Sequence, residues 1–155
     1  MYNRQKVYDY AKKWSYDRNP QYYNYDSIGG DCTNFGSQCI FSGYSQMNYS
    51  KNNGWYYING NNKSPSWTGV EFLFNFLTSN KGPGPKGKVS NINTLEIGDI
   101  IQLSFNGTTF SHTLIVIKNG LSVYDTFIAA HTDDVFEKSV SQYNFQKYRC
   151  IHIIV

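Results

Sequence analysis

One cysteine of this sequence stands where a glycine turn gives way to a helix-forming stretch. The segment at 29–39 reads GGDCTNFGSQC, and Cys32 falls in the expected first turn of the helix. The first N–H groups of a helix have no partner within it, and the helix dipole is positive at that end. Both effects favour the thiolate over the thiol, so Cys32 is the candidate nucleophile.

A nucleophilic thiol needs a base, and His112 opens an apolar stretch, FSHTLIVI at 110–117. The turn before it contains Asn106 and Gly107, so the histidine is expected at a strand end, where a side chain can face a cleft. An imidazole held there can take the thiol proton and later return it to a leaving amine. Cys32 and His112 therefore form the candidate dyad.

A third polar residue is expected from the next strand, whose end reads FIAAHTDD at 127–134. A neighbour in a hairpin can hydrogen-bond the ring nitrogen of His112 that is turned away from the thiol. His131, Asp133 and Asp134 are the candidates on this segment.

The other cysteines and histidines predict no metal site. Cys39 lies seven residues after Cys32 on the same predicted helix, roughly 10 Å away along the axis and too distant for a disulfide. Cys39 and Cys150 are expected to be small core residues. His152 lies in an apolar terminal strand, where alternation places it on the solvent face, and it is not expected to be catalytic. No metal or organic cofactor is expected, because neither cysteines nor histidines have a ligand spacing.

Helical and strand periodicities divide the chain into two halves. The expected helices are 3–16, 32–41 and 68–79, with long loops at 17–30 and 45–66. The expected strands, all later in the chain, are 97–105, 110–117, 122–130 and 148–155. Helices followed by an antiparallel sheet are typical of the α+β class, and 155 residues suit a single domain over 1–155.

Composition narrows the classes of partner. Hydrophobic residues make up 40% of the chain and charged residues 16%, which is typical of a folded protein. The net charge of +3 comes from scattered basic residues, whereas nucleic-acid binding usually needs a clustered basic face. No apolar run reaches the length of a membrane span or a signal sequence. We expect a monomer with no nucleic-acid partner and no membrane insertion.

The ordered motifs resemble those of papain-like, NlpC-type bacterial cell-wall cysteine hydrolases. They are GGDCTNFGSQC, LEIGDIIQLSF at 95–105, FSHTLIVIKNG at 110–120 and FIAAHTDD. The likeness is closer to the "Putative amidase domain" family, which has CTNFVSQC and a Trp-bearing loop similar to residues 64–68. It covers nearly the whole chain and implies a papain-like fold, with N-terminal helices packed on a C-terminal antiparallel sheet.

The resemblance implies a role for each matching residue. Cys32 matches the nucleophile, His112 the general base and His131 the residue that orients the base, with Asp134 as the alternative. The backbone N–H of Cys32 is the expected oxyanion donor. Asp31 is expected to have a structural role, as a helix cap or salt-bridge partner.

Four further residues are candidates for binding substrate. Trp55 and Tyr56 lie in the loop at 45–66, and flat aromatic faces bind sugars or peptides at low entropic cost. Trp67 is expected instead to anchor that loop to the core. Asn34 and Gln38 are candidates for lining the cleft, the alternative being that they are simply solvated.

The implied function is hydrolysis of an amide bond in peptidoglycan, as in endolysins and autolysins. The bond is either that between the lactyl group of the sugar and the first alanine, or one within the stem peptide. Two alternatives are a catalytically silent wall-binding module and an acyl transferase or protease that uses the same dyad. With no signal sequence in the chain, we expect release from the cytoplasm, as for a phage lysin or sporulation hydrolase, or a fragment of a secreted protein.

Overall fold

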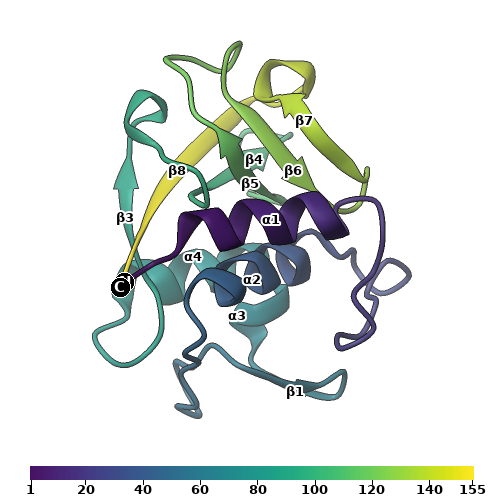
Figure 1. The fold of residues 1–155 in the computed structure, drawn as a ribbon, viewed down its shortest axis with the longest axis vertical. Coiled ribbons are helices and arrows are strands. Elements are labelled where there is room, and N and C mark those ends of the chain that lie inside the picture. Colours follow the sequence, from purple (N-terminus) through teal and green to yellow (C-terminus); the bar gives the residue numbers. More distant parts are fainter.

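The helices of the computed structural model, which describes residues 1–155, lie together on one side of a sheet (Figure 1). They are α1 (Arg4–Trp14), α2 (Cys32–Gly43), α3 (Pro65–Thr68) and α4 (Val70–Ser79). The expected helix at 68–79 is thus α4, and the short helix α3 before it was not predicted. Pro65, with its fixed φ, begins α3, and Gly69 has an extended backbone that separates α3 from α4.

Six antiparallel strands form the main sheet, in the order β3-β8-β4-β5-β6-β7. Their bounds are β3 (Lys86–Ser90), β4 (Ile100–Ser104), β5 (His112–Lys118), β6 (Phe127–Ala130), β7 (Val135–Ser139) and β8 (Lys147–Ile154). The last strand inserts between β3 and β4, so the C-terminal segment lies inside the sheet. The α+β class expected from the sequence is confirmed.

The strands that bury little of their surface were not predicted from the sequence. The edge strands β3 and β7 are mostly half-buried or exposed, so they show no strong alternation of apolar and polar residues. A small hairpin of β1 (Tyr57–Asn59) and β2 (Asn62–Lys63) lies in the expected loop at 45–66. The expected strand at 122–130 is shortened to β6, because Asp125 accepts hydrogen bonds from the N–H groups of Leu121 and Ser122 and folds that segment into a turn.

Alternation along the strands builds two apolar clusters, one on each face of the sheet. Ile100 and Ile115 belong to the cluster shared with the helices, whereas their neighbours Ile101 and Leu114 belong to the cluster on the opposite face. Two short 3₁₀ turns, Ile92–Thr94 and Val140–Gln142, contribute to that second cluster. The sheet is therefore buried on both faces at β4 and β5, the strands that lead to His112.

The two ends of the chain meet at one side of the molecule (Figure 1). Arg4, the first residue of α1, donates hydrogen bonds to the carbonyl of Ile153 and to the buried carboxylate of Asp99. His152 contacts that same carboxylate through Nδ1, 2.8 Å away, and its ring is partly exposed. No helix combines the length and the apolar character needed to cross a membrane.

Candidate active site

The starts of α2 and β5 lie side by side and bring Cys32 next to His112. Cys32 is the first residue of α2 and His112 the first of β5, and the following residues, Thr33 and Thr113, are hydrogen-bonded through their hydroxyls at 2.9 Å. Cys32 and His112 are 7% and 6% exposed. The helix start thus places the thiol against the imidazole, in an environment that favours the thiolate.

Asp133 is the carboxylate that faces His112. Its Oδ1 lies 3.6 Å from Nε2 of the imidazole, an ion-pair distance, which leaves Nδ1 as the ring nitrogen available to the thiol. The expectation that His131 orients His112 is therefore wrong. The alternative, Asp134, is also wrong, because its carboxylate is bound by Arg18 at 2.8 and 3.1 Å.

Asp133 owes its position to an unusual turn between β6 and β7. Thr132 has φ of 88° and Asp134 has φ of 38°, both left-handed conformations that cost a non-glycine residue roughly 1–2 kcal/mol. The ion pair between Arg18 and Asp134 holds one end of this turn. Asp133 lies at the centre of the turn, and its side chain therefore points toward β5 rather than toward solvent.

The ionisation of Cys32, His112 and Asp133 is coupled. Burial raises the pKa of the Cys32 thiol, but hydrogen bonds from His112, the Thr113 backbone and Thr33 outweigh burial, and the pKa falls below its ordinary value. Burial lowers the pKa of His112, and its contacts with Asp133 and Cys32 raise it overall to about 9. Despite its burial, Asp133 has a pKa well below its usual range, because His112 and Lys138 favour the carboxylate. These contacts therefore favour the form of the site with a thiolate, an imidazolium and a carboxylate.

A surface pocket of about 410 Å³ opens onto this group. Phe105 and Tyr143 flank the imidazole, with the Tyr143 ring edge-on to it at 5.5 Å. Lys138 lies over the face of the Tyr143 ring and donates to Asp133 at 3.1 Å. The full lining is Gly29, Gly30, Cys32, Phe105, Ser111, His112, Thr132, Asp133, Lys138, Gln142, Tyr143 and Asn144. A substrate chain can reach the thiol through this opening.

The residues expected to bind substrate lie elsewhere. Trp55 is fully buried and donates to Ser37 at 3.0 Å, so it is a core residue and not a binding wall. Trp67 is also fully buried, 4.7 Å from Trp55 between ring centroids, as expected of an anchor. Tyr56 is half-buried, packs against Tyr49 and does not line the pocket of Cys32.

The two amides expected in the cleft are buried as well. Asn34 is 1% exposed, donates to Asp31 and to the Tyr23 carbonyl, and accepts from Trp67. Gln38 is 3% exposed and accepts a hydrogen bond from Tyr10 at 2.7 Å. Neither expectation for these amides holds, because α2 is covered on almost every side and its polar side chains are hydrogen-bonded within the protein rather than to solvent or substrate.

His131 is buried behind the helix start. Its Nδ1 is 2.6 Å from the Asp31 carboxylate and its Nε2 is 2.7 Å from the carbonyl of Trp14. The ring stacks on Phe35 at 3.9 Å. Asp31 is therefore a salt-bridge partner, as expected, and its side chain makes no helix-capping bond.

Residues that the sequence analysis did not single out complete the site. Thr113 registers β5 against α2, Arg18 holds the turn that carries Asp133, and Tyr143 and Lys138 form part of the pocket wall. Only Thr113 had a local signal, since it adjoins the candidate base. The others come from loops and edge strands, and only the fold brings them near Cys32.

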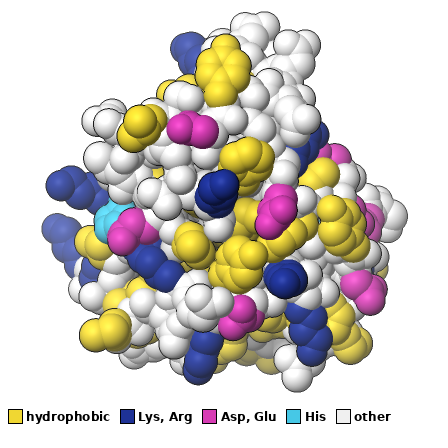
Figure 2. Space-filling model, turned by 45° about the horizontal axis from the view of Figure 1, so that its top comes forward, with side chains coloured by type: hydrophobic (Ala, Val, Ile, Leu, Met, Phe, Trp, Pro, Cys, Tyr) yellow, Lys and Arg dark blue, Asp and Glu magenta, His cyan; other side chains and the backbone are white.

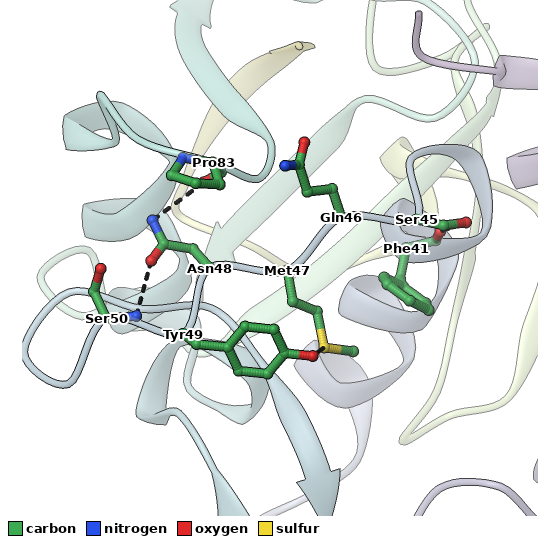
Figure 3. Close-up of a pocket in the computed structure, with 8 residues that line it drawn as sticks. All are labelled: Phe41, Ser45, Gln46, Met47, Asn48, Tyr49, Ser50 and Pro83. Carbon is green, nitrogen blue, oxygen red and sulfur yellow. Dashed lines mark hydrogen bonds between the residues drawn. The ribbon is translucent and has the colours of Figure 1, made fainter.

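A larger pocket, of about 690 Å³, lies beyond the other end of α2 (Figure 3). Met47, Asn48 and Tyr49 are among the residues that line it. Asn48 donates to the Pro83 carbonyl and accepts from the Ser50 N–H, and the Tyr49 hydroxyl contacts the Met47 sulfur. It contains no charged side chain and no cysteine or histidine. The candidate catalytic residues line only the smaller of these two pockets.

Charge is dispersed over the face of the molecule that Figure 2 draws. On this face, Lys and Arg side chains are interspersed with Asp, Glu and hydrophobic residues, without a continuous basic patch. No cluster of three or more His, Cys, Asp or Glu side chains has the arrangement of a metal site. The three cysteines are free and buried, and Cys39 and Cys150 lie in the two apolar clusters, as expected.

Fold and site together define an α+β domain with a Cys–His–Asp group at a helix N-terminus. The chain belongs to the family described as "Putative amidase domain", whose model matches residues 1–154. The family description indicates a hydrolase.

A relative is found in Bacillus subtilis (strain 168). The chain is 33% identical to "Uncharacterized protein YhbB" over 120 residues, which is 76% of this chain. The match spans 37% of the length of the relative, so the relative is a longer protein. No solved structure matches the chain significantly.

Proposed function

We propose that this domain hydrolyses amide bonds in bacterial peptidoglycan through a covalent acyl-enzyme on Cys32. The observation that carries the proposal is the Cys32–His112–Asp133 group at the start of α2, beneath an open pocket. Membership of an amidase family supports amide cleavage. The likeness of the sequence motifs to those of cell-wall cysteine hydrolases supports peptidoglycan as the substrate.

The site geometry supplies each step of amide hydrolysis. The thiolate of Cys32 attacks the carbonyl carbon, and the developing oxyanion accepts a hydrogen bond from the Cys32 N–H at the helix start. The imidazolium of His112 gives its proton to the departing amine, which breaks the C–N bond and leaves a thioester. His112, now neutral, then takes a proton from water, and the resulting hydroxide attacks the thioester. Collapse of the intermediate breaks the C–S bond, releases the acid product and restores the thiolate of Cys32 beside the imidazolium of His112.

Asp133 supports both halves of this cycle. Its carboxylate faces Nε2 of His112, so Nδ1 is the nitrogen that exchanges the proton with the thiol and with the leaving amine. Cleavage occurs either between the lactyl group and the first alanine or within the stem peptide.

Incubation of purified peptidoglycan with the protein, followed by mass analysis of soluble products, tests this function. The wild type should release fragments, and Cys32→Ala and His112→Ala should release none above background. Cys150→Ala is the matched control, since it removes a buried thiol that is not in the pocket. A new amino terminus on alanine identifies an amidase, and a shortened stem identifies an endopeptidase.

Three other outcomes would contradict the proposal. Fragment release by Cys32→Ala would remove the thiol from the mechanism. A wild type that co-sediments with peptidoglycan but releases nothing would indicate a wall-binding module. A wild type that neither binds nor cuts would exclude peptidoglycan, and hydrolysis of unrelated peptides would then identify a protease.

A further inference from the structure

A buried histidine outside the catalytic group is bonded to two acceptors. The Nε2 atom of His131 faces the Trp14 carbonyl at 2.7 Å, and Nδ1 faces the Asp31 carboxylate at 2.6 Å. A carbonyl oxygen has no proton, so Nε2 must carry one. Another proton lies between Nδ1 and Asp31, whichever atom holds it. The His131–Asp31 pair is therefore neutral overall, and both side chains are 1% exposed.

Asp31 connects this pair to the nucleophile, since it directly precedes Cys32. Its Oδ1 accepts hydrogen bonds from the Tyr25 N–H and the Asn34 amide, each 2.9 Å long. These bonds hold the Gly29–Gly30 turn and the first turn of α2 together. A bare carboxylate in this buried position would disfavour a thiolate on the next residue.

We propose that His131 is a positioning residue that neutralises Asp31, so that Asp31 fixes the start of α2 without opposing the thiolate of Cys32. The carbonyl of Trp14, the last residue of α1, contributes as well, because its hydrogen bond with Nε2 fixes the orientation of the His131 ring. The proposal rests on Cys32 being the nucleophile of the proposed function. It does not depend on which amide is cleaved.

Arg18 does not replace His131 in this role. Its Nε lies 3.6 Å from Asp31, but the same guanidinium binds Asp26 and Asp134 at closer range. One arginine thus faces three carboxylates, and the proton shared by His131 and Asp31 neutralises one of them. The titratable and charged groups that act on the pair are Tyr10 from α1, Arg18, Tyr25 and Asp26 from the following loop, and the adjoining Cys32 of α2. Beyond them, His112 of β5 and Asp133 of the β6–β7 turn act on Cys32 or on each other, and Asp134 binds Arg18.

Alkylation of Cys32 by iodoacetamide across a pH series tests the proposal without any substrate. The full chain is used, and mass analysis of peptides reads the label on Cys32 apart from Cys39 and Cys150. His131→Gln keeps a hydrogen-bond donor but removes the cation, so the midpoint of alkylation should rise by about one to two pH units. The rate at pH 7 should then fall about tenfold or more.

Two companion variants separate charge from structure. Asp31→Asn exchanges one neutral pair for another, so its midpoint should match that of the wild type. The double variant Asp31→Asn/His131→Gln removes the bare carboxylate and should return the midpoint toward the wild-type value. His152→Gln is the matched control, because His152 pairs with buried Asp99 in the same way but does not line the pocket of Cys32.

The outcomes are decisive even where one variant is unstable. If folded His131→Gln has the same alkylation midpoint as the wild type, the proposal is wrong. It is also wrong if the double variant has a midpoint as high as that of His131→Gln alone. If His131→Gln fails to fold, Asp31→Asn decides alone. A midpoint lowered by about one pH unit would show that Asp31 is a bare charge in the wild type, and an unchanged midpoint would show that it is neutralised. Loss of peptidoglycan hydrolysis in the wild type would affect the proposed function and not this result.

Discussion

At the scale of single residues, the site is an ion-paired group whose members set one another's charge. Contacts with Asp133 and Cys32 raise the pKa of His112 to about 9, and contacts with His112 lower the pKa of Cys32. Only the histidine can serve as acid toward the leaving amine, and only the thiolate can attack. The active form of the site is therefore the one with the proton on His112.

This charge state predicts a bell-shaped dependence of kcat/KM on pH. Activity should fall on the acid side as the thiolate gains a proton, and on the alkaline side near pH 9 as His112 loses the proton that it gives to the amine. Rates of amide hydrolysis from pH 5 to 10 measure both limits. Asp133→Asn removes the carboxylate that raises the pKa of His112, so the alkaline limit should move toward neutral pH.

Asp9→Asn is the control for that shift. It changes an exposed carboxylate on α1, which accepts a hydrogen bond from Gln5 and does not contact His112. Its alkaline limit should stay near pH 9. An Asp133→Asn profile identical to the wild type would show that another group orients the histidine.

At the scale of elements, the position of Cys32 depends on how α2 packs against α1 and the sheet. α2 is buried along nearly its whole length, and α1 crosses it where Gly43 ends the helix. A side chain on Gly43 would lie 2.5 Å from Val7 and 2.9 Å from the Asn3 carbonyl. The close approach of the two helices therefore requires glycine at this position.

Gly43→Ala should lower the free energy of unfolding by about 1–3 kcal/mol, because overpacking outweighs the gain in helix propensity. Urea denaturation followed by circular dichroism measures it. Gly82→Ala is a suitable control, since its nearest neighbour would be the end of the Asn48 side chain at 3.3 Å. A Gly43→Ala protein as stable as the wild type would mean that α1 can shift without cost.

At the scale of the whole molecule, the N-terminal helix is tied to the C-terminal strand. Arg4, near the N-terminus, donates hydrogen bonds to the buried carboxylate of Asp99 and to the carbonyls of Ile97 and Ile153. Ile153 lies near the C-terminus, so these bonds join the two ends of the chain. The same helix ends at Trp14, whose carbonyl holds His131. The contacts between the two ends of the chain therefore hold α1 in place, and α1 in turn holds His131 behind the candidate site.

Arg4→Gln should destabilise the fold by about 1–3 kcal/mol, since it leaves Asp99 and the two carbonyls short of a donor. A thermal melt compared with the wild type measures the loss. Glu96→Gln removes only the exposed partner of Arg4 and should change the melting temperature little. Equal effects of the two variants would show that the bridge to Asp99 contributes nothing.

The sequence by itself determined the features with a local physical cause. Glycines before Cys32 and a helical pattern after it predict a thiol at a helix start, and an apolar run predicts the strand that begins at His112. Alternating apolar residues predict the buried strands and, with the preceding helices, the α+β class. These signals are local because burial on a regular element repeats with a fixed period.

Only the tertiary structure decided which residues complete the site. His131, Asp133 and Asp134 lie within one short segment, and two left-handed residues in the turn send them to three different partners. The burial of Trp55 likewise depends on how its loop folds back onto α2, where Trp55 donates to Ser37. The edge strands β3 and β7 form because the sheet offers them hydrogen-bond partners, which their own mixed sequences do not indicate. Such choices depend on contacts between distant segments, and no local period records them.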